Sequence, residues 1–252
     1  MVLGLPPVLP SSSTCKFQQT FFNNEKKNVS IEDGPSTIGE HEIHIWAFVI
    51  DPTAEVPSKD DVSPEEWQRA ARFHKESDRR FYLAERSLRR RLFGHYLNID
   101  PRMIQMSQNS TGKPFFTQPQ DQWLRFNIAH SGWRILYALA RDREIGVDIE
   151  MHDDHLLYSD MAQETWLPGI GQILKSVAPA ERAAVFFSQW TRMEAQVKMT
   201  GEGLSHTKHS ALGRSELYDL ALGPDCSGAV AIERRPAVQS TDNALYLFHG
   251  RI

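Results

Sequence analysis

An order of elements that occurs twice constrains the fold most: a strand, a long helical region and then further strands. Residues 42–50 are mostly β-branched and aromatic, which is typical of a strand, and a helical region follows from about residue 63. A second helical region, at about 179–200, is also followed by strands. The other strands are expected at 125–132, 134–140, 145–150, 216–218, 229–232 and 244–248. This order favours an α+β fold.

Start and stop signals mark both helical regions. Ser63 is suited to be an N-cap and Pro64 to occupy the first helical position. Residues 179–181 open the second helix, and Gly201 ends it. In the first region, apolar residues recur at spacings of three and four, as in a core-facing stripe: Phe81, Ala84, Leu88 and Leu92.

The two sets of elements predict two similar halves, each a long helix packed on a small, mainly antiparallel sheet. The halves are expected to be joined near residue 145, so that 41–145 form the N-terminal half and 146–252 the C-terminal half. Residues 1–40 are rich in Pro, Ser, Asn and Gly and show no sustained period. They are predicted to be a poorly ordered extension.

Charge and cysteine content exclude several classes of protein. A net charge of -4 gives no general basic character, so nucleic-acid binding is not expected. The two cysteines, Cys15 and Cys226, are far apart, which argues against a disulfide framework and a zinc site. No apolar run approaches the ~20 residues of a membrane span. The sequence therefore predicts a reduced, cytoplasmic, soluble protein without a membrane partner.

Two acids on one predicted strand are the first candidate site residues. Side chains alternate along a strand, so Asp148 and Glu150 project from one face and Val147 and Ile149 from the other. Paired carboxylates suit Mg²⁺, which proteins commonly hold with one or two carboxylates and substrate phosphates. The alternative is an amphipathic strand whose acidic face meets water.

The second predicted helix carries a matching group. Trp190, Glu194 and Lys198 are spaced by four residues and lie along one helix face, which Phe187 extends. The alternative is a surface Glu–Lys pair worth roughly 0.3–0.5 kcal/mol. Added to the strand acids, this pair supplies what a metal–diphosphate site needs: a third carboxylate and an ammonium that neutralises a leaving phosphate.

The first helical region has an excess of basic residues. Its basic side chains share a face away from the apolar stripe: Arg72, Arg79, Arg86 and Arg90. Such a face is either solvated or a docking face for an anionic ligand.

Four motifs in order give the chain a specific resemblance. Residues 112–114 read G-K-P, 126–131 read F-N-I-A-H-S, 146–150 read G-V-D-I-E, and 190–201 contain W-T-R-M-E-A-x-x-K-x-x-G. This set resembles the Sfp-type 4'-phosphopantetheinyl transferases, which prime polyketide and peptide synthetases. The resemblance covers about residues 42–250. It implies a pseudo-symmetric pair of α+β halves with the active site in the cleft between them.

The resemblance also implies an activity and its catalytic residues. The activity is Mg²⁺-dependent transfer of 4'-phosphopantetheine from coenzyme A to a serine of an acyl or peptidyl carrier protein, releasing adenosine 3',5'-bisphosphate. Asp148, Glu150 and Glu194 would hold Mg²⁺. Glu194 or a carboxylate-bound water would be the base, and Lys198 would steady the leaving phosphate.

Coenzyme A contacts and partners follow from the same resemblance. Lys113, His130 and Arg69 would contact coenzyme A, together with Lys198. Taken singly, His130 reads as an ordinary strand-end histidine and Lys113 as a solvated loop lysine. The carrier protein would serve fatty-acid, polyketide or peptide synthesis. A monomer is expected, because both halves belong to one chain.

Two residues depart from the family pattern. Ala129 stands where the family usually has a serine, and Met193 replaces the usual lysine before Glu194. They motivate a second interpretation: a non-catalytic relative that binds coenzyme A or a carrier protein. Magnesium nucleases with two acids and a lysine are a third candidate, but their E-x-K pair lies on a strand, whereas here the spacing is E-x-x-x-K on a helix.

Overall fold

The computed structural model describes residues 26–27, 29–51, 53, 61–153, 169–203, 214–235 and 243–251. The strands are β1 (Lys26–Lys27), β2 (Glu42–Val49), β3 (Met106–Gln108), β4 (Pro114–Phe116), β5 (Leu124–Ser131), β6 (Arg134–Arg141), β7 (Ile145–Met151), β8 (Ser215–Asp219), β9 (Cys226–Glu233) and β10 (Ala244–Arg251). The α-helices are α1 (Pro64–Ala70), α2 (Glu76–Leu97), α4 (Ile170–Ser176) and α5 (Arg182–Thr200), with single 3₁₀ turns η2 (Pro101–Met103), η3 (Pro119–Asp121) and η4 (Pro179–Glu181).

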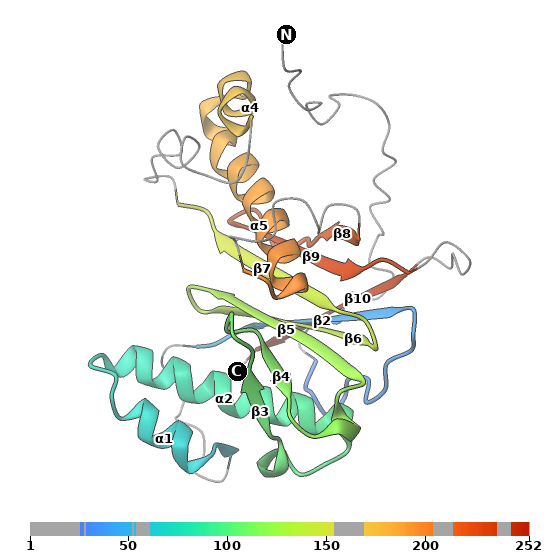
Figure 1. The fold of residues 1–252 in the computed structure, drawn as a ribbon. Coiled ribbons are helices and arrows are strands. Elements are labelled where there is room, and N and C mark those ends of the chain that lie inside the picture. The colour runs from blue at the N-terminus through green and yellow to red at the C-terminus, as the bar shows by residue number, and fades with distance from the viewer. Residues whose placement is uncertain are drawn as a thin grey trace.

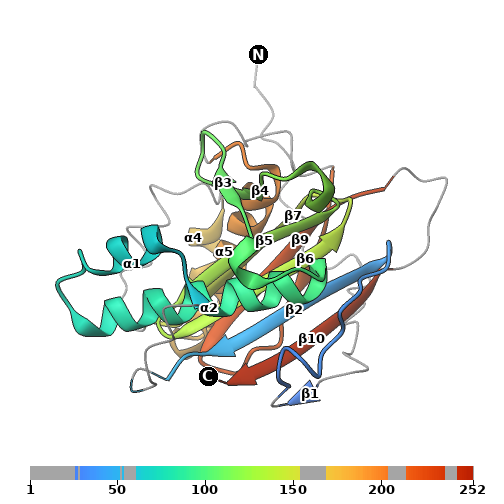
Figure 2. The same ribbon diagram turned by 90° about the horizontal axis from the view of Figure 1, so that it is seen from below.

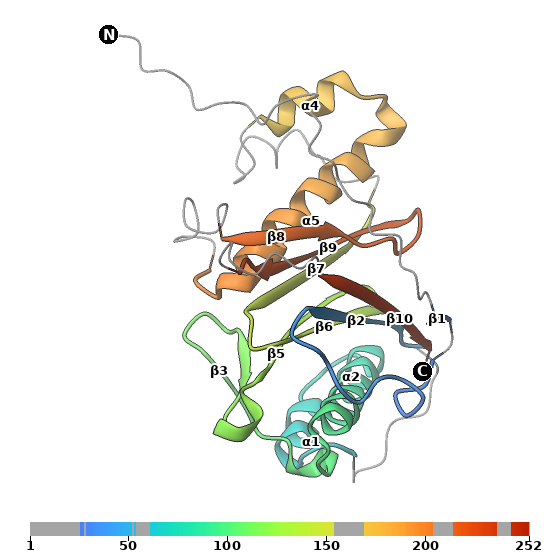
Figure 3. The same cartoon turned by 90° about the vertical axis from the view of Figure 1, so that its right-hand side faces the viewer.

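The elements form four layers, helix, sheet, sheet and helix, which confirms the α+β class (Figures 1 and 3). One outer layer is α2, which lies across a five-stranded sheet of order β1-β10-β2-β6-β5 (Figure 2). Three residues of the predicted stripe, Ala84, Leu88 and Leu92, are buried against this sheet. The other outer layer is α5, which packs on a three-stranded sheet of order β7-β9-β8. The pseudo-symmetry of the two halves stays a prediction.

The two sheets share one apolar core. On β7, Val147 and Ile149 face the five-stranded sheet, as strand alternation predicts, and pack with residues such as Ile45 and Leu136. Their alternates on β7 therefore face α5. The edge strands β5 and β7 lie next to each other, which brings the second and third predicted motifs together.

Local signals placed most elements correctly. Ser63 forms a full capping box with Glu66, and Gly201 ends α5 in the left-handed conformation. The first helical region forms two helices, because the helical conformation is interrupted between Ala70 and Glu76. In the part of the chain that the structure describes, no helix is long and apolar enough to cross a membrane.

Two segments differ from the sequence expectation. β10 was expected to be one of the antiparallel strands of the second half, but it runs parallel to β2 inside the first sheet. Residues 29–40 lie within the predicted extension, yet they form a loop whose Ile31 and Ile38 are buried in the core beside α2. Residues 1–25 of that extension lie outside the described residues.

Candidate active site

The closeness of α5 and β7 depends on Gly146. A Cβ placed on Gly146 would lie 2.1 Å from the Ala195 carbonyl oxygen and 2.3 Å from the Met199 nitrogen, so only glycine permits this contact. Gly146 shares its strand face with Asp148 and Glu150. The helix that carries Glu194 and Lys198 is therefore held directly over the acidic face of β7.

Asp148 and Lys198 form the centre of the site. The Lys198 Nζ donates to Asp148 Oδ1 over 2.5 Å. Asp148 is only 3% exposed, and among the described residues nothing donates to its buried Oδ2. Burial raises the pKa of Asp148 to about 7, with Glu150 and Glu194 adding to the rise and Lys198 opposing it. A buried carboxylate oxygen without a hydrogen-bond donor costs free energy, and a bound cation would compensate for the missing hydrogen bond.

The other two acids lie close enough to Asp148 for their charges to raise its pKa. Burial raises the pKa of Glu194 above its usual range, Lys198 opposes this, and the Glu150 charge adds to it. Glu150 accepts a hydrogen bond from the Ser131 hydroxyl of β5 over 3.0 Å. The sequence prediction that α5 and β7 bring acids and a lysine together is consistent with these contacts.

Side chains of β5 support β7 through its backbone. Asn127 Oδ1 accepts from the Val147 N–H, and the Ser131 hydroxyl accepts from the Met151 N–H, each over 3.0 Å. Ala129 lies between them on the same strand face and is buried in the core between the sheets. A serine there would face β7 and the core, so the departure at Ala129 removes a hydroxyl from this interface.

The donor set fits a divalent cation by chemistry. Asp148 Oδ2 is a hard oxygen without a donor in the described structure, and Glu150 and Glu194 are close enough to affect its pKa. Within the described residues, however, no three His, Cys, Asp or Glu side chains form a metal-binding group. The assignment of Asp148, Glu150 and Glu194 as three metal ligands therefore stays a prediction. In this structure Asp148 Oδ1 accepts a hydrogen bond from Lys198.

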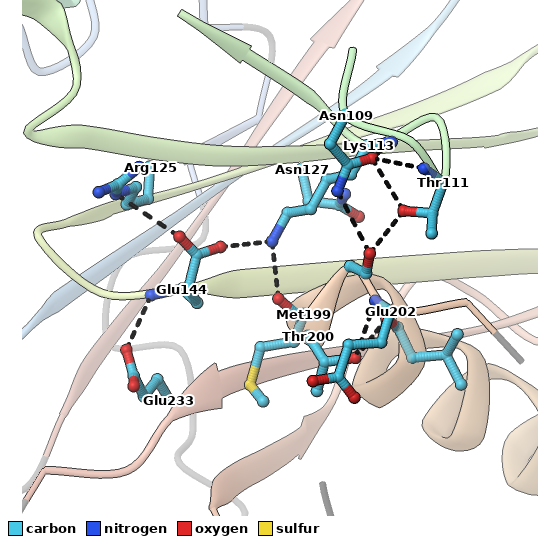
Figure 4. Close-up of polar contacts among 12 residues, drawn as sticks. Asn109, Thr111, Lys113, Arg125, Asn127, Glu144, Met199, Thr200, Glu202 and Glu233 are labelled. Atoms are coloured by element: carbon cyan, nitrogen blue, oxygen red, sulfur yellow. Dashed lines mark hydrogen bonds and ion pairs between the residues drawn. The ribbon is translucent and has the colours of Figure 1, made fainter. Parts of the chain in front are cut away.

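Lys113 lies at the contact between the halves, beside the end of α5 (Figure 4). Its Nζ donates to Glu144 Oε2 over 2.5 Å and to the Met199 carbonyl over 2.7 Å. Burial lowers the pKa of Lys113, and the Glu144 carboxylate opposes this. Lys113 also lines a cavity of about 200 Å³, together with Arg125, Glu144, Phe115 and Thr200. The predicted contact of Lys113 with a phosphate stays a prediction.

His130 and Arg69 lie away from this cavity lining. His130 is exposed, and its ring packs edge-on against the Phe81 ring of α2, with 5.4 Å between the ring centroids. Arg69 of α1 lies 5.8 Å from the centre of the Tyr82 ring and lines a separate surface pocket with Arg72. Both remain predicted coenzyme A contacts.

The basic face of the first helical region is divided between structural and accessible positions. Arg90 is buried and pairs with Glu66 over 2.8 Å, which fastens α1 to α2. Arg79 pairs with Glu76 at the surface, and Arg72 is exposed. Arg90 is therefore structural, and it is not part of an accessible docking face.

Sequence reasoning assigned no role to several residues that organise the site. Gly146 and Asn127 lie within the quoted motifs, but their packing and backbone contacts depend on neighbours far away in the sequence. Strand alternation could have identified Ser131, because it lies on the same strand face as Asn127, four residues earlier. Arg125 precedes the same motif and contributes a basic group to the cavity.

Comparison with known proteins gives consistent results. A family model described as "4'-phosphopantetheinyl transferase, N-terminal" matches residues 58–141. The chain is 30% identical over 212 residues to the 4'-phosphopantetheinyl transferase HetI of Nostoc sp., covering 78% of this chain and 90% of that protein. It is 32% identical over 141 residues to the 4'-phosphopantetheinyl transferase AcpT of Escherichia coli, covering 53% and 70%. A 4'-phosphopantetheinyl transferase of Bacillus subtilis is 30% identical over 145 residues, covering 57% and 62%.

Proposed function

Because the chain belongs to the 4'-phosphopantetheinyl transferase family, we propose that it moves the 4'-phosphopantetheine of coenzyme A onto a serine of an acyl or peptidyl carrier protein. The other product is adenosine 3',5'-bisphosphate, and the reaction depends on Mg²⁺. The observation that best supports this reaction is the buried Asp148 oxygen without a donor in the described structure, placed beside Lys198 and Glu194.

The carboxylates of the site would hold the ion. Asp148, Glu150 and Glu194 are its proposed ligands, since all three have carboxylate oxygens and the Glu150 charge raises the pKa of both Asp148 and Glu194. A bound Mg²⁺ would neutralise charge on the diphosphate and orient it.

Proton transfer belongs to Glu194 in this proposal. The carrier serine attacks the phosphorus of the phosphopantetheine, its oxygen forms the new P–O bond, and the bond to the 3',5'-bisphosphate breaks. Glu194, or a water bound to it, accepts the hydroxyl proton. Burial raises the pKa of Glu194, which makes its carboxylate a better base than an exposed glutamate.

Lys198 stabilises the leaving phosphate. Its ammonium is held at the site by Asp148, so it needs little reorganisation when negative charge develops on the leaving oxygen. Coenzyme A is proposed to bind beside α5, with Arg69, Lys113 and His130 as predicted contacts. Arg125 adds a further basic group at the cavity that Lys113 lines.

Mass spectrometry of an apo carrier protein tests this proposal. After incubation with the protein, coenzyme A and Mg²⁺, the carrier should gain one phosphopantetheine on its serine. Glu194→Gln should abolish the gain, whereas Glu202→Gln, beyond the end of α5, should retain it. Binding of coenzyme A without any gain by the wild type would contradict the proposal and favour a non-catalytic relative.

A further inference from the structure

The end of α5 is fastened by a loop from the other half of the chain. A helix leaves its last carbonyl groups without intrahelical partners. In α5, the Gly201 N–H bonds back to the Val197 carbonyl over 3.0 Å, whereas the Met199 and Gly201 carbonyls accept from groups outside the helix. Both accept hydrogen bonds from side chains of residues 109–113, the loop that joins β3 to β4.

Three side chains of the 109–113 loop make these bonds (Figure 4). The Thr111 hydroxyl donates to the Gly201 carbonyl over 2.5 Å, and Asn109 Nδ2 donates to the same oxygen over 3.2 Å. Lys113 Nζ donates to the Met199 carbonyl over 2.7 Å. A cation at this position also interacts favourably with the negative end of the helix dipole.

The 109–113 loop is internally ordered before it meets α5. Asn109 Oδ1 accepts from the backbone N–H groups of Thr111 and Lys113, over 3.1 and 2.8 Å. The Asn109 N–H bonds to the Lys113 carbonyl over 3.0 Å. These bonds order the loop backbone and the Asn109 side chain, so the loop loses little entropy when it binds the helix end.

Gly201 makes the close approach possible. Its φ of +66° suits glycine, and a Cβ there would lie 3.0 Å from Lys113 Cδ and 3.2 Å from Asn109 Nδ2. The helix end and the loop are thus complementary in shape as well as in hydrogen bonding.

The fastened turn is the one that carries Lys198. The backbone of Gly146 in β7 packs closely against the backbone of Ala195 and Met199 in α5, and the 109–113 loop binds the end of this helix. We propose that Asn109, Thr111 and Lys113 are positioning residues, which hold the last turn of α5 so that Lys198 stays against Asp148. This inference rests on the proposed function of the same site.

A substitution at Thr111 distinguishes a positioning role of the loop from direct contact with coenzyme A. Lys113 and Asn109 line the 200 Å³ cavity, so their replacement changes both the helix end and the cavity wall. Thr111 is exposed, uncharged and outside that lining. Replacing its hydroxyl therefore removes the contacts of that hydroxyl with the Gly201 carbonyl and with Asn109 Oδ1, without removing a group from the cavity lining.

Steady-state kinetics of Thr111→Val and Thr111→Ser test the proposal. Thr111→Val should lower kcat about 3- to 10-fold, the effect of one lost hydrogen bond, with KM for coenzyme A unchanged. Thr111→Ser keeps the hydroxyl and should retain the wild-type kcat. An unchanged kcat in Thr111→Val, or a rise in KM alone, would overturn the positioning role.

Hydrogen exchange tests the same inference without the reaction. The amides of Thr200 and Gly201 should exchange at least about 3-fold faster in Thr111→Val and in Lys113→Met than in the wild type or Thr111→Ser. Equal exchange in all four proteins would overturn the inference. Absence of transfer by the wild type would instead refute the proposed function, and the exchange comparison would still decide whether the loop holds the helix.

Discussion

Asp148 is a buried acid, and its two oxygens have different environments. Lys198 binds Oδ1, whereas Oδ2 is buried and lacks a donor within the described structure. Hydrogen bonding to a buried carboxylate is worth about 1.5–3 kcal/mol, so leaving one oxygen unsatisfied lowers stability. The residue is therefore suited to bind a cation rather than to stabilise the fold.

Magnesium should stabilise the wild type against heat and should not stabilise Asp148→Asn. An ion that binds only the folded state adds ~1.4 kcal/mol at ten times its Kd, a rise in Tm of about 3–5 °C. Thermal unfolding with and without Mg²⁺ measures this difference. Asp219→Asn, at an exposed acid paired with Arg192, should keep the shift. Equal shifts in wild type and Asp148→Asn would remove Asp148 from the ligand set.

His44 should make stability depend on pH. Burial lowers its pKa to about 4 from 6.5, although Glu42 opposes this, and Tyr96 bonds its Nδ1 over 2.7 Å. Between pH 6.5 and 4 the unfolded chain gains a proton that folded His44 does not, so stability falls as the pH falls, by up to about 3 kcal/mol. Urea unfolding across this range should show a smaller slope for His44→Gln. The exposed His74→Gln should keep the wild-type slope.

At the scale of elements, the contact of α5 with β7 decides the geometry of the site. The amphipathic patterns of both elements were readable from the sequence, including the face shared by Asp148 and Glu150. The close approach at Gly146 was not, because it depends on the Ala195 and Met199 backbone, about fifty residues later. The bond from Lys113 to the helix end could not be predicted either, because a lysine in a loop has many compatible partners.

Gly146→Ala should separate the two elements. The added Cβ would overlap the backbone of α5, which is rigid, so a loss of about 1–3 kcal/mol and a large fall in transfer activity are expected. Gly39→Ala is the control, because its Cβ would meet only the flexible Glu42 side chain in an exposed loop. Chemical denaturation and the carrier assay measure both effects. Wild-type stability and activity in Gly146→Ala would show that α5 can move without consequence.

At the scale of the molecule, the two sheets and the last strand join the halves. β10 follows all the elements of the second half, yet it pairs in parallel with β2 along its whole length. Element types and most boundaries followed from local signals such as Ser63 and Gly201. The partner of β10 did not, because strand patterns specify a buried face and leave the neighbouring strand open.

Leu247→Ala in β10 should therefore destabilise both halves together. Leu247 is buried in the core shared by the two sheets, and truncating a buried leucine typically costs 2–5 kcal/mol. Hydrogen exchange should show equal losses of protection in α2 and α5. The more exposed Val49→Ala in β2 should cause a much smaller loss. Protection lost in α2 alone would mean that the halves unfold independently.

The position of β10 also affects how the chain folds during synthesis. β2 emerges from the ribosome early, and its neighbour in the sheet is made only after the whole second half has been translated. Until then one side of β2 has unpaired backbone groups, the kind of open strand edge on which aggregation begins. The nascent first half consequently depends on late residues to close its sheet, and chaperone binding to the newly made chain should persist until Ala244–Arg251 can pair with β2.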